Sequence, residues 1–244
     1  MGSTLQLFRK MASKKVEELK DTFSGDRPGE RIDKNLPLNL RINGFVEISE
    51  VDFLLGSDDI KIRHPEGRGV VAAYGVSQVF RSTVHKFYVD FQDDQDYLLQ
   101  IVVGENEDIE ECKFFWSADT VYPDDWDFWL NENTGYIGYS VFDTTDKTRY
   151  YRVWENPGAE KVVEEGEGGE RITRVPPVDF SETLYFDSNG KKTEIVKHSA
   201  MLYGRHANDN VDEYLLVDLN EYTDTSFVQV LIGLELNPSS LDVI

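Results

Sequence analysis

The sequence predicts a mainly β (α+β) protein whose antiparallel sheets form a sandwich or a partly open barrel. From Leu36 onward, apolar residues alternate with polar ones or form short runs between turn residues, which is typical of short antiparallel strands. Before this point, apolar residues recur at the helical spacing of three and four residues. We therefore expect an amphipathic helix over residues 1–25, a polar linker over 26–35 and a β-rich domain over 36–244.

The N-terminal segment has one apolar stripe, which is formed by Leu5, Phe8, Ala12, Val16, Leu19 and Phe23. Ser3 suits the start of this helix, Gly25 suits its end, and Pro28 prevents its continuation. A helix of this length needs packing partners to be stable in water.

The same segment is basic, although the chain of 244 residues carries a net charge of −21. Such a helix can pack on its own acidic body, occupy the groove of a protein partner or lie on an anionic membrane surface. We assign the contact with a partner or membrane to Leu5, Phe8, Arg9, Lys10, Lys14, Lys15 and Leu19.

Turn residues divide the chain after Leu36 into short strands. QDDQ, between STVHKFYVDF and DYLLQIVV, is a candidate hairpin turn. A strand at KFFWSA precedes a short helix near 123–131, because Pro123 suits a first helical turn and Asp124 and Asp125 suit the positive end of its dipole. Further strands are expected on both sides of DTTDK.

Residues 156–177 are expected to form a surface excursion, because Pro, Gly and Glu replace large apolar residues there. An internal boundary of the β-rich domain is expected here. SNGK then joins two strands in a hairpin. VVAAYG, DYLLQIVVG and CKFFW are echoed by SAMLYG, DEYLLVDLNE and FVQVLIG, so a duplicated β unit is one interpretation.

All four tryptophans lie between Cys112 and Trp154. Because each aromatic side chain can bury about 150–250 Å², this stretch is expected to form the centre of the core, with Trp116, Trp126, Trp129 and Trp154 mostly buried. The single cysteine excludes an internal disulfide and a multi-cysteine zinc site. Acidic neighbours would raise the pKa of its thiol, so we interpret Cys112 as a core residue.

The strongly negative charge repels phosphate backbones, so no nucleic-acid partner is expected. The sequence has no apolar run long enough to span a membrane and no signal peptide. We therefore expect a cytoplasmic protein, peripheral to the inner membrane if the N-terminal helix contacts lipid. No motif requires a cofactor.

Acids among aromatic residues give the one weak candidate for catalysis. Asp119, Asp124 and Asp125 lie in SADTVYPDDWDFW, and a glycosidase cleft combines paired carboxylates with aromatic rings in this way. Capping of a helix start by Asp124 and Asp125 is the simpler interpretation.

Histidines could form a metal site if a hairpin brought His198 and His206 together with Asp209 or Glu213. Their spacing matches no metal-binding motif, so structural or exposed histidines are favoured and no metal is expected.

GYIGYSVF, RYYRVWE, MLYGR and DEYLLV follow one another, and this arrangement resembles the bacterial YjfK-like family of uncharacterised proteins over most of residues 36–244. The resemblance implies a cytoplasmic protein without an established activity. It also implies a gene near those of a membrane-stress protein similar to phage-shock protein A and of an enzyme similar to glutathionylspermidine synthetases. It assigns no functional residue.

We therefore expect a noncatalytic cytoplasmic interaction protein in a membrane- or envelope-stress system, with an unidentified protein partner. The alternatives are a carboxylate-dependent hydrolase of glycans and a module that binds a cation such as a polyamine. An exposed apolar patch would favour the interaction protein. An acid pair about 5–10 Å apart in an open cleft would favour the hydrolase, and an acidic pocket walled by Tyr or Trp would favour the cation binder.

Overall fold

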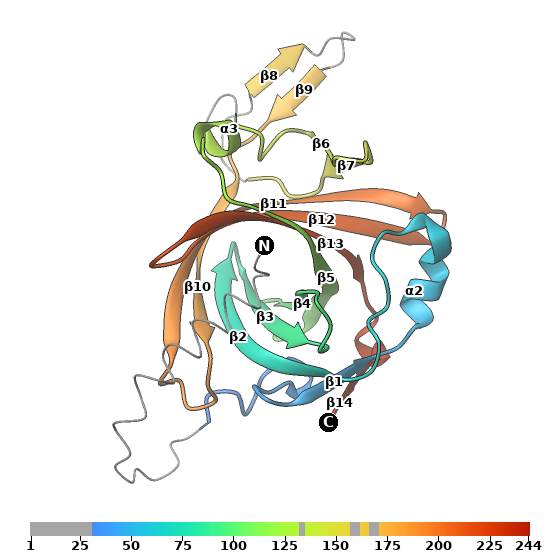
Figure 1. Ribbon diagram of the computed structural model, residues 1–244, viewed down its shortest axis with the longest axis vertical. Helices are drawn as coiled ribbons and strands as arrows, with labels where there is room; N and C mark the ends of the chain where they lie inside the picture. Colours follow the sequence, from blue (N-terminus) through green and yellow to red (C-terminus); the bar gives the residue numbers. More distant parts are fainter. Residues whose placement is uncertain (1–30, 132–134, 157–161, 166–170) are drawn as a thin grey trace.

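The computed structural model is a closed antiparallel barrel of eight strands with additional strands around it. The structure describes residues 31–131, 135–156, 162–165 and 171–244. The barrel strands are β2 (Gly69–Val79), β3 (Ser82–Asp90), β4 (Tyr97–Val103), β5 (Ile109–Val121), β10 (Val178–Tyr185), β11 (Thr193–Asn208), β12 (Val211–Glu221) and β13 (Ser226–Glu235). Their order is β2-β3-β4-β5-β13-β12-β11-β10, and β10 closes the ring by pairing with β2 (Figure 1).

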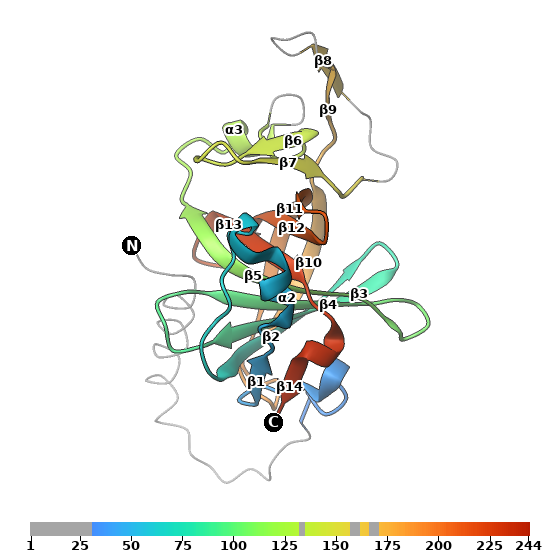
Figure 2. The same ribbon diagram turned by 90° about the vertical axis from the view of Figure 1, so that its right-hand side faces the viewer.

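Shorter elements surround the barrel. One group is η1 (Pro37–Asn39), β1 (Phe45–Ile48), α2 (Val51–Gly56), η2 (Ser57–Asp59), η3 (Pro238–Ser240) and β14 (Leu241–Val243). A second group is α3 (Asp127–Leu130), β6 (Val141–Asp143) and β7 (Arg149–Arg152). The strands β8 (Val162–Glu165) and β9 (Arg171–Arg174) form a separate ribbon that projects away from the barrel (Figures 1 and 2).

The inward face of the barrel is a core to which all eight strands contribute, because alternate side chains of each strand point inward. Its apolar members include Ala73, Tyr88, Leu98, Phe115, Leu184, Leu202, Leu216 and Leu231. Charged and polar side chains are buried on the same face, among them Lys86, Gln100, Glu182, His198, Asp218 and Gln229. The barrel is therefore filled by side chains of both kinds.

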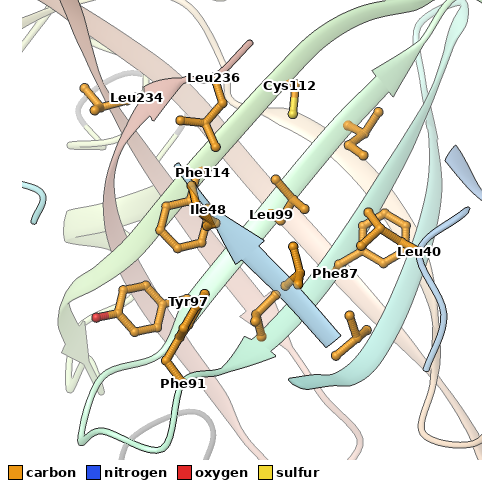
Figure 3. Packing of buried hydrophobic residues seen from close by; sticks show 14 of the residues in the cluster. Leu40, Ile48, Phe87, Phe91, Tyr97, Leu99, Cys112, Phe114, Leu234 and Leu236 are labelled. Carbon is orange, nitrogen blue, oxygen red and sulfur yellow. The ribbon is translucent and has the colours of Figure 1, made fainter. Parts of the chain in front are cut away.

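The outward face of β3, β4 and β5 forms a second core beneath β1. Phe87, Leu99 and Phe114 are fully buried there, and Ile48 of β1 packs on them from the other side (Figure 3). Cys112 belongs to this cluster, which confirms that it is a core residue in a strand. Strands β3, β4 and β5 are therefore buried on both faces.

A third core covers the outward face of β11, β12 and β13. Residues Ile137, Phe142 and Tyr150, from the aromatic stretch, are buried in it. The four tryptophans of that stretch pack at the margins of the cores, with most of their surface buried: Trp116, Trp126, Trp129 and Trp154. The prediction that these side chains are mostly buried is therefore confirmed.

The predicted hairpins at QDDQ and SNGK join β3 to β4 and β10 to β11. The strands expected on both sides of DTTDK are β6 and β7. The short helix predicted near 123–131 is α3. Asp125 marks its start rather than Pro123, because Asp125 Oδ1 accepts hydrogen bonds from the amides of Asp127 and Phe128 at 3.0 and 3.4 Å. Local turn and capping chemistry was therefore a reliable guide.

The barrel consists of two four-stranded meanders, β2–β5 and β10–β13. A duplicated unit would give this arrangement, but VVAAYG lies in the first strand of its meander and SAMLYG in the second. Duplication stays a prediction, as does the internal boundary at 156–177.

The predicted N-terminal helix lies outside the described residues. None of the helices in the described part of the chain is long and apolar enough to cross a membrane.

Candidate functional site

The barrel interior contains a ring of four charged side chains, each at most 3% exposed: Lys86, Glu182, His198 and Asp218. Lys86 Nζ lies 3.2 Å from Glu182 Oε2 and 3.3 Å from Asp218 Oδ2. His198 joins the same two carboxylates, with Nδ1 3.0 Å from Asp218 Oδ1 and Nε2 3.2 Å from Glu182 Oε2. Two cations and two carboxylates therefore alternate, and we call this set the charge ring.

Neighbouring residues fit closely around the charge ring. Tyr88 OH donates a hydrogen bond to Glu182 Oε1 at 2.9 Å. The ring of Phe180 stacks on that of His198 with the centroids 4.7 Å apart. Gly75 leaves room for Glu182, because a Cβ at Gly75 would overlap the carboxylate. The surroundings therefore hold the ring in one arrangement.

Electrostatic attraction overcomes the cost of burial in the charge ring. Burial alone would lower the pKa of His198, but the combined interactions with Asp218 and Glu182 outweigh it, and the pKa is raised above its ordinary value. Burial alone would raise the pKa of Glu182 and of Asp218, yet Lys86 and His198 hold both below their usual range. The neighbours of each group thus favour its charged form, and all four side chains are inaccessible to a substrate. The ring therefore acts as an ionic cross-link between four strands.

The surface offers a different kind of site at α2. Val51, Leu54 and Leu55 are 58%, 69% and 53% exposed, and their spacing of three and four residues places them on one face of the helix. The opposite face carries Phe53, which is buried and packs edge-to-face on Phe114 with the centroids 6.3 Å apart. The helix thus directs an apolar stripe towards solvent.

Acidic residues border this stripe. Glu50, Asp58 and Asp59 are exposed, and a depression of about 540 Å³ between α2 and residues 60–64 is lined by Glu50, Leu54 and Asp58 together with Ile60. We call Val51, Leu54 and Leu55, with Glu50, Asp58 and Asp59, the α2 surface. It combines an apolar centre with negative charge at its edge.

Hydrogen bonds from β11 fix the C-terminal end of α2. Asn208 Nδ2 donates to the carbonyl oxygen of Leu55 at 3.2 Å, and Arg205 Nη2 donates to that of Asp59 at 2.6 Å. The exposed stripe therefore belongs to a helix that is tied to the barrel.

Glu213 of β12 extends this attachment into the protein. Its carboxylate is fully buried and accepts hydrogen bonds from Tyr150 OH at 2.8 Å, from Arg205 Nε at 2.9 Å and from the Lys61 amide. One buried side chain thus joins the segment after α2 to β7, β11 and β12.

The three acids considered for catalysis are exposed and serve local structure where their contacts are defined. Asp119 Oδ1 accepts a hydrogen bond from the Thr120 amide at 2.8 Å, and Asp125 caps α3. Asp124 is exposed beside that cap. The capping interpretation is confirmed for Asp125.

His198 and His206 do not come together. His198 lies in the charge ring, whereas the side chain of His206 is 90% exposed and contacts Asp212. Within the described residues, no group of three or more His, Cys, Asp or Glu side chains is placed to hold a metal ion. Burial, with Glu235 nearby, raises the pKa of Cys112 to about 12, so its thiol is a poor nucleophile.

A cleft of about 750 Å³ lies between β7 and the ends of β11 and β12. Tyr151 and Tyr214 line it, but so do Arg149 and Arg205. Arg149 Nε is 2.8 Å from Asp143 Oδ1. An acidic pocket walled by tyrosine would favour a cation-binding module. This cleft is lined by positively charged arginines as well, so it does not match that description.

Sequence reasoning overlooked both the charge ring and the α2 surface. A signal existed for each. Lys86, Glu182 and Asp218 interrupt apolar faces of alternating strands, and VDFLLG has an apolar residue at positions i, i+3 and i+4. The predicted contact residues of the N-terminal segment lie outside the described residues, namely Leu5, Phe8, Arg9, Lys10, Lys14, Lys15 and Leu19.

Comparison with known proteins gives a family but no activity. A family model described as a protein of unknown function, DUF2491, matches residues 7–242. No curated protein and no solved structure matches the chain.

Proposed function

Because the chain belongs to the DUF2491 family of unknown function, we propose a function from its surfaces: it is a noncatalytic interaction protein. The α2 surface carries this proposal. Its three exposed apolar residues are held outward by a helix whose other face is buried. Clustered exposed apolar side chains bordered by charge are typical of sites that bind another protein segment.

The chemistry of the α2 surface favours a basic amphipathic helix as the bound element. An apolar stripe on such a helix would cover Leu54 and Leu55, while its basic residues would face Glu50 and Asp58. The charge ring supports a scaffold role for the barrel, because its buried titratable groups cross-link four strands and are inaccessible to a substrate.

We propose further that the protein works in the cytoplasm in a response to membrane or envelope stress, as its resemblance to YjfK-like proteins implies. In this proposal the basic N-terminal segment provides recruitment to a protein partner or to the anionic inner membrane. The hydrolase and the cation-binding module are less well supported, because Asp125 caps a helix and the cleft beside β7 contains arginines.

The test compares four forms of the protein in the cells of its origin: wild type, a deletion of residues 1–25, Leu54→Glu/Leu55→Glu, and Ile195→Glu. Ile195 is 58% exposed on β11 and serves as the matched control. We expect both variants to remain folded in thermal melts. The double variant should lose co-purifying protein, and the deletion should lose co-sedimentation with membranes. Unchanged association of both variants would contradict the proposal.

A further inference from the structure

The α2 surface lacks a covering element among the described residues, and α2 cannot turn its apolar stripe inward. Its other face is occupied by Phe53, and its C-terminal end is held by Asn208. Exposed Leu54 is therefore not a consequence of a loosely attached helix. A separate amphipathic segment is needed to remove the stripe from water.

Charge and pattern match this surface to the N-terminal segment of the same chain. The predicted stripe of that segment is apolar, and residues 1–16 contain four basic residues and no acid: Arg9, Lys10, Lys14 and Lys15. The edge of the α2 surface carries exposed carboxylates at Glu50, Asp58 and Asp59. Opposite charges around two apolar stripes favour one docking orientation.

Residues 1–30 provide chain for both a helix and a linker to the first described residue. The described residues begin at Arg31, whose Nη2 lies 2.7 Å from Asp33 Oδ2, and the Ile32 amide donates to the Ser188 carbonyl oxygen at 2.9 Å. A helix over residues 3–24 would be about 33 Å long at 1.5 Å per residue. Residues 25–30 could add about 20 Å when extended. The family match begins at residue 7, so most of this segment belongs to the family sequence.

We propose that residues 3–24 dock on the α2 surface of the same chain in the free protein and shield Leu54 and Leu55 until a partner or membrane competes for them. This inference rests on the proposed function, since it names the occupant of the same surface. The N-terminal segment would then compete with the partner for the α2 surface. Release of the basic segment would expose the α2 surface at the same time.

The test is hydrogen–deuterium exchange of residues 50–60 in the full chain, comparing wild type with Leu5→Glu/Phe8→Glu. Gln6→Glu/Ser13→Glu is the control, because it adds the same charge beside the predicted stripe instead of on it. We expect exchange of the α2 amides to be at least about tenfold slower in wild type and in the control than in the stripe variant at low salt. Equal exchange in all three would overturn the proposal.

A carbodiimide cross-link provides the second measurement. Lys10, Lys14 or Lys15 should be joined to Glu50, Asp58 or Asp59 within monomers, and Leu54→Glu should remove the product. Mixing isotopically light and heavy protein identifies cross-links between copies, and cross-links of that kind alone would contradict docking within one chain. If docking fails while association in cells still depends on Leu54, the proposed function stands. If docking is observed but association in cells is unchanged by replacing Leu54, the proposed function fails.

Discussion

The Nδ1 atom of His198 lies 3.0 Å from both carboxylate oxygens of Asp218, across the adjacent strands β11 and β12. The opposite ring nitrogen is directed to Glu182, so both nitrogens of the imidazole face carboxylates. An imidazole can donate from both nitrogens only when it is protonated. The two carboxylates therefore favour the protonated imidazole, and the two positive charges of Lys86 and protonated His198 then balance the charges of Glu182 and Asp218.

Removing one cation from the charge ring should lower the unfolding free energy, because the charges of the ring are then no longer balanced. Lys86→Met leaves two carboxylates with a single cation in the barrel interior, and breaking such a buried pair costs about 3–5 kcal/mol of unfolding free energy. Urea unfolding measures this loss. Lys197→Met is the control, because Lys197 is exposed on the neighbouring outward face and should change stability little.

Restoring the balance should recover part of that loss. In Lys86→Met/Asp218→Asn, one cation and one carboxylate remain, so the double variant should be less destabilised than the sum of its two single variants. Strict additivity would show that the four groups do not act as one ring.

The charge ring also predicts a dependence of stability on pH. The pKa of His198 is raised on folding above its ordinary value of 6.5, so its contribution is complete below about pH 6.5 and is lost as pH rises through the folded-state pKa. We expect the difference in unfolding free energy between wild type and His198→Gln to shrink as pH is raised from about 6 to 9. A constant difference over this range would show that folding does not raise the pKa of His198.

On the acidic side, the pKa of Glu182 and of Asp218 is lowered on folding. Their contributions are therefore complete above their ordinary values and are lost as pH falls through the folded-state values. Stability of the wild type should decline more steeply below about pH 4 than stability of a variant in which Lys86 and Asp218 are already replaced.

Gly75 should be the least replaceable residue of β2. A methyl group there would overlap the carboxylate of Glu182, which the charge ring prevents from moving away. We expect Gly75→Ala to lower the unfolding free energy by about 1–3 kcal/mol. Ser77→Ala lies two residues along the same inward face and removes a buried hydroxyl that has no hydrogen-bond partner, so it should be neutral or stabilising. Equal melting temperatures for the two variants would refute this account.

The sequence predicted the elements better than their arrangement. Hairpins at QDDQ and SNGK follow from turn chemistry that acts over a few residues, and Asp125 capped its helix as expected. Closure of the barrel depends on β10 pairing with β2 across about a hundred residues, for which a single sequence has no local signal.

The charge ring was equally hidden. Lys86 and Asp218 lie 132 positions apart in the chain, and each appears in the sequence as an ordinary charge in a strand. Only the closed barrel brings them together. The α2 surface could have been noticed from the spacing of VDFLLG, but the outward direction of that stripe depends on Phe53 packing on Phe114.

Glu213 gives the last prediction, because it links the α2 region to the barrel. Glu213→Gln keeps the size of the side chain but removes the charge that Arg205 contacts at 2.7 Å. We expect a loss of about 1–3 kcal/mol in unfolding free energy, since a buried acceptor of several hydrogen bonds is weakened. Amide exchange in residues 51–61 should rise more than exchange elsewhere, because the Lys61 amide and the Asp59 carbonyl depend on this contact directly or through Arg205. Glu221→Gln, an exposed position on the same strand, is the control. A uniform rise in exchange over the whole barrel would show that Glu213 stabilises the fold in general and does not specifically hold α2 in place.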